Sequence, residues 1–134
     1  MIEINNLTDY TVDKKTFSTV AKKVLKGENR ETQIISLALV SKEEIKKLNQ
    51  KFRKKDKPTD VLSFELKEKD FLGEIIICPD VVKENAEKYG VDIKSEILKV
   101  FVHGILHLCG YDHEKSVEGA EEMERKEKEY LSKI

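Results

Sequence analysis

The chain has 134 residues, of which 39% are apolar and 38% charged, and 25 basic and 26 acidic side chains give it a net charge of −1. This length suits one domain over residues 1–134 that buries enough surface to need no disulfide or structural metal. The near-neutral charge excludes a polycation that attracts nucleic acid through its global field, so any such contact must come from a local patch.

The N-terminal stretch MIEINN alternates apolar and polar residues, which predicts a strand. Asp13 then offers a cap for a helix that reaches about Lys26, with apolar residues at helical spacing along it. Gly27 follows as the expected stop of that helix. The stretch TQIISLALVS predicts a second strand, so the chain opens in the order β-α-β.

A capping box of Ser41 and Glu44 predicts a second helix, which we expect to end near Phe52. The stretch RKKDKPTD at 53–60 is polar and predicts a loop. Two more strands follow it, joined by a charged connection: VLSFEL (61–66) and GEIIIC (73–78).

The last third of the chain predicts three helices. Asp80 offers a cap for the first of them, which Gly90 would end. Asp92 offers a cap for the next, which is apolar nearly all round as far as Cys109 and is therefore expected to be the buried central helix. Ser116 would start a highly charged helix that runs to the C-terminus.

The resulting order, β-α-β-α-β-β-α-α-α, predicts a single α+β domain. We expect a mixed four-stranded sheet packed with about five helices. The central buried helix would carry the histidine motif that begins at residue 103.

Cysteine content and the N-terminus bear on the compartment. The chain has two cysteines, and Met1-Ile2-Glu3-Ile4 lacks the basic and apolar segments of a signal peptide. No apolar run approaches membrane-spanning length. We therefore expect a cytoplasmic protein with reduced thiols and no membrane partner.

All three histidines lie in HGILHLCGYDH, residues 103–113. His103 and His107 are one helical turn apart, so their imidazoles share a face of the helix. Gly110 accepts a positive φ, and a chain reversal there can bring His113 toward the same face. Three neutral imidazoles favour tetrahedral Zn²⁺ with a fourth position open for water, which is typical of a catalytic site.

The spacing H-x3-H-x2-G-x2-H also occurs in metzincin proteases, whose motif is H-E-x-x-H-x-x-G-x-x-H. Gly104 stands where those enzymes place their glutamate base, so we predict a metzincin-like zinc site without the usual peptidase chemistry. Cys109 is two residues past His107 and should point to the other side of the helix. Met123 lies in a helical pattern and is interpreted as packing.

Polar residues near the motif have two interpretations each. Arg53 begins the basic cluster RKKDK, which is either a solvated loop or a phosphate-contacting patch, and arginine can bind phosphate bidentately. Asp60 either bonds backbone amides in a turn or orients groups in a cleft beside the metal. Asp112 either accepts a hydrogen bond from a ligand imidazole or braces the turn after the helix.

HGILHLCGYDH is similar to the signature of the YbeY family, the bacterial endoribonucleases and ribosomal RNA maturation factors. The resemblance spans roughly residues 34–131, whereas the N-terminal third carries little family signal. Three further stretches resemble family blocks: LNQKFRKKDKPTDVLSFEL (48–66), LGEIIICPDVV (72–82) and EGAEEMERKEKEYL (118–131).

The resemblance implies one zinc ion held by His103, His107 and His113, in a single-strand-specific endoribonuclease. It implies action in maturation of the 3′ end of 16S ribosomal RNA and in ribosome quality control, with RNA as partner and the ribosome or its proteins as further partners. It also implies a catalytic and substrate-binding role for Arg53. Lys54 and Lys55 are further candidates for binding substrate.

Metal-assisted phosphodiester hydrolysis is the mechanism we expect, with Arg53 neutralising charge on the phosphate. Water and the RNA 2′-hydroxyl both remain open as nucleophile, and the general base is unassigned. Two other functions stay open at this point: another zinc hydrolase, such as a peptidase, and a noncatalytic zinc-binding ribosome assembly factor.

Overall fold

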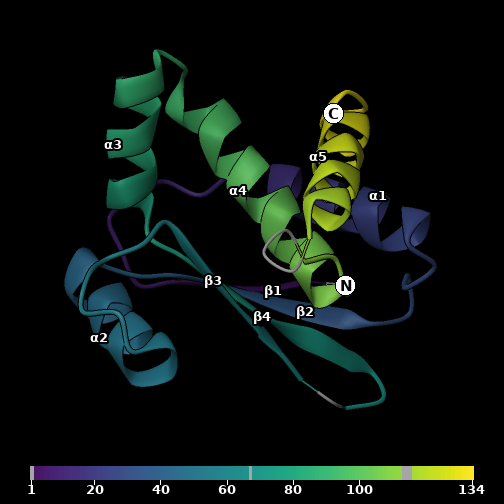
Figure 1. Cartoon of the computed structure of the whole chain (residues 1–134), viewed down its shortest axis with the longest axis horizontal. Coiled ribbons are helices and arrows are strands. Elements are labelled where there is room, and N and C mark those ends of the chain that lie inside the picture. Colours follow the sequence, from purple (N-terminus) through teal and green to yellow (C-terminus); the bar gives the residue numbers. More distant parts are fainter. Residues whose placement is uncertain (1, 67, 113–115) are drawn as a thin grey trace.

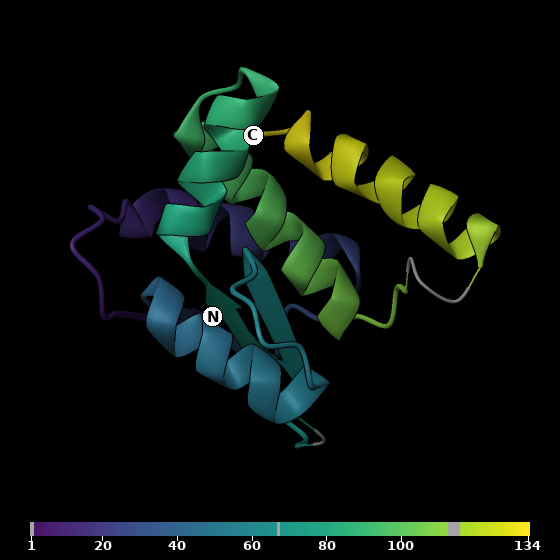
Figure 2. The same ribbon diagram turned by 60° about the vertical axis from the view of Figure 1, so that its left-hand side comes forward.

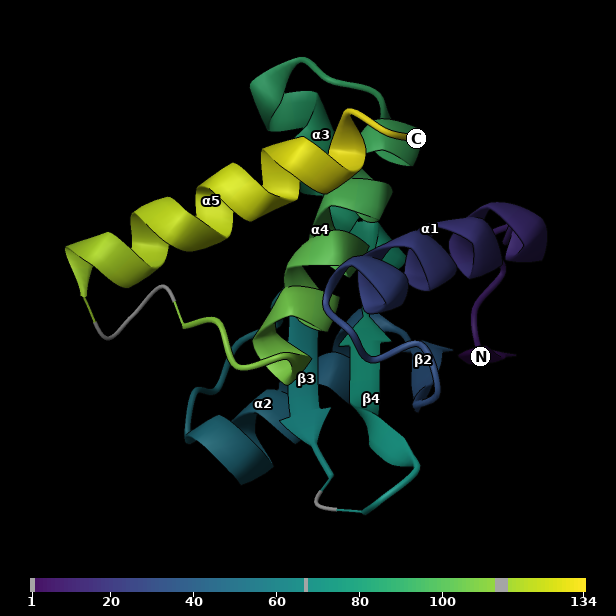
Figure 3. The same ribbon diagram turned by 90° about the vertical axis from the view of Figure 1, so that its right-hand side faces the viewer.

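A four-stranded sheet lies at the centre of the fold (Figure 1). The structure is a computed structural model, and it describes residues 2–66, 68–112 and 116–134. The strand order is β1-β2-β4-β3; β1, β2 and β4 run parallel, and β3 runs antiparallel to β4, as the opposed arrows in Figure 3 show. The strands are β1 (Ile2–Asn6), β2 (Ile34–Leu39), β3 (Val61–Glu65) and β4 (Phe71–Ile77).

Five helices pack around this sheet, as the sequence predicts, and they divide between its two faces. Helix α2 lies on one face, whereas α1 and α4 lie on the other, with α3 and α5 packed against α4 (Figures 1 and 2). The helices are α1 (Lys14–Gly27), α2 (Lys42–Arg53), α3 (Pro79–Tyr89), α4 (Ile93–Leu108) and α5 (Val117–Leu131). In the described part of the chain, none of them is long and apolar enough to cross a membrane.

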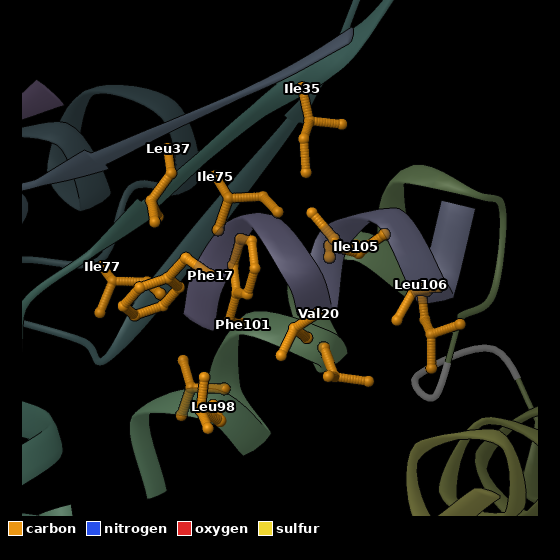
Figure 4. Close-up of a cluster of buried hydrophobic side chains, with 14 of the residues drawn as sticks. Phe17, Val20, Ile35, Leu37, Ile75, Ile77, Leu98, Phe101, Ile105 and Leu106 are labelled. Atoms are coloured by element: carbon orange, nitrogen blue, oxygen red, sulfur yellow. The ribbon is translucent and has the colours of Figure 1, made fainter. Parts of the chain in front are cut away.

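Two hydrophobic clusters fill the two faces of the sheet. In the larger cluster, Phe17 of α1 meets Phe101 of α4 edge to face at 5.0 Å between ring centroids, over Ile75 and Ile77 of β4 (Figure 4). The intervening Ile76 points the opposite way, because side chains alternate along a strand. The smaller cluster lies under α2 and consists of Val40, Ile45, Leu62, Ile76 and Cys78.

Four of the predicted helix starts are confirmed by their hydrogen bonds. The side chains of Asp13, Ser41, Asp92 and Ser116 each accept a hydrogen bond from the backbone N–H three residues later. Each bond satisfies one of the amides that a helix start leaves without an internal partner. Local sequence signals therefore determine where α1, α2, α4 and α5 begin.

Two residues predicted to mark helix boundaries, Asp80 and Gly27, have other positions than expected. Helix α3 begins at Pro79 with Cys78 as its cap, so Asp80 lies inside the first turn, because proline fits the first helical position, where no N–H is needed. Gly27 lies inside α1, and the left-handed residue after that helix is Asn29, with φ 59°. Gly27 is glycine for a different reason: a Cβ there would collide with the ring of Tyr130.

Candidate functional site

Two histidines of α4 form the core of the candidate site. His103 and His107 lie one turn apart, and their ring centroids are 4.8 Å apart with an interplanar angle of 78°. Both side chains are only partly buried, whereas the neighbouring Ile105 and Leu106 are fully buried against the sheet and α1. The apolar residues thus fix the rotation of α4 so that this pair of imidazoles faces outward.

Glu127 of α5 holds one of these imidazoles. Its Oε1 contacts Nδ1 of His103, and the two side chains are 12% and 27% exposed, respectively. A carboxylate at Nδ1 fixes the orientation of the ring and leaves Nε2 as the nitrogen able to bind a metal. The sequence did not single out Glu127, because it is one of many glutamates in a charged helix and no local pattern distinguishes it.

The histidines open onto a cleft of about 620 Å³ between α4, β3 and the end of α2. This size falls within the roughly 300–1,000 Å³ typical of ligand sites. Its walls combine cationic, acidic and hydroxyl groups from three separate parts of the chain. Among its lining residues are Arg53, Asp60, Ser63, His103, His107 and Asp112.

Gly104 lies between the two histidines but faces the sheet. A Cβ at this position would lie 3.0 Å from the side chain of Ile75 and 3.2 Å from Oγ of Ser63. Ser63 Oγ also approaches the Gly104 carbonyl oxygen at 3.4 Å. A side chain at 104 would therefore require the Ile75 and Ser63 side chains to shift by a few tenths of an ångström, so the packing favours glycine at this position.

The structure brings most of the predicted site residues to this cleft. Arg53 ends α2 and lines the cleft, as do Asp60 and Asp112. Lys54 adopts a left-handed conformation with φ 56°, is exposed and does not line the cleft. Lys55 lines an adjoining pocket that also includes Arg53 and Asp60.

Asn49 anchors the loop that carries these residues. Its side chain is buried, and Nδ2 donates a hydrogen bond of 2.8 Å to the carbonyl oxygen of Lys57. The backbone N–H of Lys55 also donates to the Asn49 carbonyl oxygen, at 3.3 Å. The 53–60 segment is therefore tied to α2, which keeps Arg53 and Asp60 beside the histidines.

His113, the third predicted ligand, lies outside the described residues. Among residues 2–66, 68–112 and 116–134, no three His, Cys, Asp or Glu side chains come together as a metal-binding group. The donor set of His103 and His107, with Glu127 behind the first imidazole, nevertheless has the chemistry that zinc prefers. The described residues therefore fit part of a zinc site.

The cysteines stand apart from this site. Burial raises the pKa of the Cys109 thiol to about 11, and burial also raises that of Cys78. Thiols with raised pKa remain protonated at neutral pH, whereas a metal ligand must be a thiolate. Met123 belongs to the larger hydrophobic cluster, in agreement with its interpretation as a packing residue, and the partly buried Tyr111 packs against that cluster.

Comparison with known proteins assigns the fold and the chain to one family. A family model described as Endoribonuclease YbeY matches residues 3–134. A relative named Endoribonuclease YbeY from Thermotoga maritima is 49% identical over 100 residues, covering 75% of this chain and 67% of that protein. A relative of the same name from Nautilia profundicola is 41% identical over 136 residues, covering 100% of this chain and 91% of that protein.

A solved structure agrees with these matches. The solution structure of the Thermotoga maritima protein TM1509 superimposes with a TM-score of 0.74 at 41% sequence identity. The match covers 98% of this chain and 87% of that one. The α+β fold predicted from the sequence is thereby confirmed.

Proposed function

Since this chain belongs to the endoribonuclease YbeY family and is therefore an RNA-cleaving hydrolase of ribosomal RNA processing, we propose that it cuts single-stranded RNA at the histidine cleft with zinc bound there. His103, His107 and His113 are the proposed ligands. The proposed substrate region is the 3′ end of 16S ribosomal RNA, in the cytoplasm, in contact with the ribosome or its proteins.

The observation that carries this proposal is the meeting of Arg53 with His103 and His107 on one cleft, although they come from different elements. A phosphodiester needs a cation beside the site of attack, because negative charge grows on its oxygens in the transition state. The guanidinium of Arg53 can form two parallel hydrogen bonds to a phosphate. Its proposed role is to hold the scissile phosphate and to neutralise this charge.

The proposed zinc site fits the described residues as far as they go. When bound, zinc would supply Lewis-acid chemistry, polarising a phosphoryl oxygen or lowering the pKa of water. Glu127 keeps the proton of His103 on Nδ1, so Nε2 is the nitrogen that would bind the metal. Asp60 and Asp112 are the carboxylates that line the cleft in the described part of the chain, and we assign proton acceptance from water or the 2′-hydroxyl to one of them.

The two other functions are less well supported. The matches name RNA-cleaving proteins, which favours neither a peptidase nor a noncatalytic assembly factor. Gly104 also stands where a peptidase of the metzincin type has its glutamate, and its tight packing against Ile75 and Ser63 favours glycine there. Cleavage of an unstructured polypeptide by the purified protein, if a chelator abolished it, would support the peptidase function instead.

His107→Ala tests the catalytic metal. The variant should stay folded, lose bound zinc and lose cleavage of a single-stranded RNA, with zinc measured by elemental analysis and folding by circular dichroism. His107 is only partly buried, so its truncation leaves the hydrophobic cluster intact. A folded, zinc-free variant that cuts RNA as fast as the parent would contradict the proposal.

A further inference from the structure

An exposed aromatic side chain lines the cleft beside Arg53. Phe52 is the penultimate residue of α2, and it is 55% exposed. It shares the cleft with His103 and His107. From the sequence alone, Phe52 is only the predicted end of a helix, because its place on the cleft depends on how α2 packs against β3.

Exposure alone does not indicate a site, since Leu7 and Tyr89 are 65% and 64% exposed. Phe52 differs from them because its ring is held in place. Phe64 of β3 packs against it edge to face, with 5.0 Å between ring centroids and an interplanar angle of 65°. Phe64 itself packs on the smaller hydrophobic cluster, so the pair joins the cleft wall to the core.

Positive charge surrounds this ring. The Nζ of Lys51 lies 5.2 Å from the ring centroid of Phe52, and Arg53 follows directly in the chain. An apolar ring flanked by cations matches a single nucleic-acid strand, which presents flat bases alternating with anionic phosphates. An apolar peptide could pack against the ring of Phe52, but it would offer no anionic group to Lys51 and Arg53.

We propose that Phe52 stacks one unpaired nucleobase next to the phosphate held by Arg53, an inference that rests on the proposed RNA-cleaving function. A base inside a duplex has both faces covered by its neighbours, so it cannot reach the ring without being unstacked. Phe52 thereby acts as a specificity-determining residue that favours single strands. Phe64 positions its ring.

Steady-state kinetics form the first arm of the test. Stacking on one aromatic ring corresponds to about a 5- to 100-fold effect on binding. Phe52→Leu should raise KM for a single-stranded RNA by about this factor while kcat changes little, and Phe52→Tyr should restore the parental KM. Phe52→Leu should also discriminate less between this RNA and its duplex.

Fluorescence forms the second arm, which needs no turnover. The chain contains no tryptophan, so Phe52→Trp creates a unique reporter. In a stopped-flow experiment, mixing with the single-stranded RNA should quench the tryptophan emission at once, whereas mixing with the duplex should not. The control is Leu7→Trp, because Leu7 is also exposed, at 65%, but follows β1, the strand at the opposite edge of the sheet from β3.

The outcomes separate this inference from the function on which it rests. If the parent cleaves RNA but Phe52→Leu keeps the parental KM and Phe52→Trp is not quenched, stacking is overturned and the function stands. If the metal-loaded parent does not cleave RNA, the proposed function fails. Quenching of Leu7→Trp to the same extent would also overturn stacking at Phe52.

Discussion

Glu127 contacts Nδ1 of His103, which lies 24 residues earlier in the chain. The contact joins α5 to α4 at the candidate metal site, so the charged C-terminal helix places a carboxylate against one of the cleft's histidines. The other glutamates of α5 include solvent-facing ones such as Glu124, which pairs with Lys128 on its own helix at 3.2 Å. Glu127 and Glu124 therefore offer a matched comparison between a glutamate that contacts a histidine and one that faces solvent.

Glu127→Gln is expected to weaken zinc binding by about tenfold or more, because a neutral partner stabilises the proton on Nδ1 less and orients the imidazole less firmly. Competition with a chelating dye measures this affinity. Glu124→Gln removes the same charge from the same helix, and it should bind zinc as the parent does. Equal affinities in the two variants would show that the carboxylate at His103 has no such role.

Gly104→Glu is expected to lower the free energy of unfolding by about 2 kcal/mol or more, because it forces a carboxylate into the contact between α4 and the sheet. Urea unfolding measures this loss. Lys99→Glu on the exposed side of the same helix serves as the control and should have a much smaller effect. A Gly104→Glu protein as stable as the control would mean that α4 can move away from Ile75 and Ser63.

Arg53→Glu is expected to reduce RNA turnover by about 100-fold or more without loss of zinc, because it replaces the phosphate-binding cation by an anion. Lys54→Glu makes the same change of charge at the next residue, which does not line the cleft. Its turnover should fall only slightly. Similar losses in both variants would indicate a general effect of charge rather than a specific role of Arg53.

Alkaline pH is expected to destabilise the protein. The pKa of Cys109 rises from 9.0 in its ordinary state to about 11 through burial, and burial with the Glu28 carboxylate raises that of Tyr111 to about 12. The folded state therefore keeps protons that the unfolded chain releases, and the free energy of unfolding falls as pH rises from about 9 to about 11.

Urea unfolding of the parent and of Cys109→Ala between pH 8 and pH 11 measures this effect. The variant should lose stability less steeply over that range, with Tyr111 accounting for part of the remaining slope. Identical slopes in the two proteins would contradict the assignment to the thiol.

The sequence predicted those parts of the molecule that depend on neighbours along the chain. Caps such as Asp13 and Ser41, and the one-turn spacing of His103 and His107, are local patterns, and the structure reproduces them. Phe52 and Glu127 could not be found in this way. Their roles depend on α2 packing against β3 and α5 packing against α4, which the spacing of residues within a helix does not encode.

The unexpected positions of Gly27 and Asp80 have a similar origin. Gly27 is a typical helix stop by composition, yet its lack of a side chain serves the contact with Tyr130, more than 100 residues away in sequence. Asp80 is a common capping residue, but Pro79 precedes it and takes the first helical position. In each case a second physical requirement outweighed the usual preference of the residue type.

Because the two hydrophobic clusters lie on opposite faces of the sheet, the helix that carries the histidines and the helix that carries Arg53 and Phe52 are supported separately, although both reach the same cleft. His103 and His107 belong to a helix that rests on the larger cluster, whereas Arg53 and Phe52 end a helix that rests on the smaller one. Sequence changes around Ile45 would therefore move Arg53 and Phe52 while the spacing of the imidazoles is preserved. In the proposed function, substrate preference could thus diversify independently of the histidine pair.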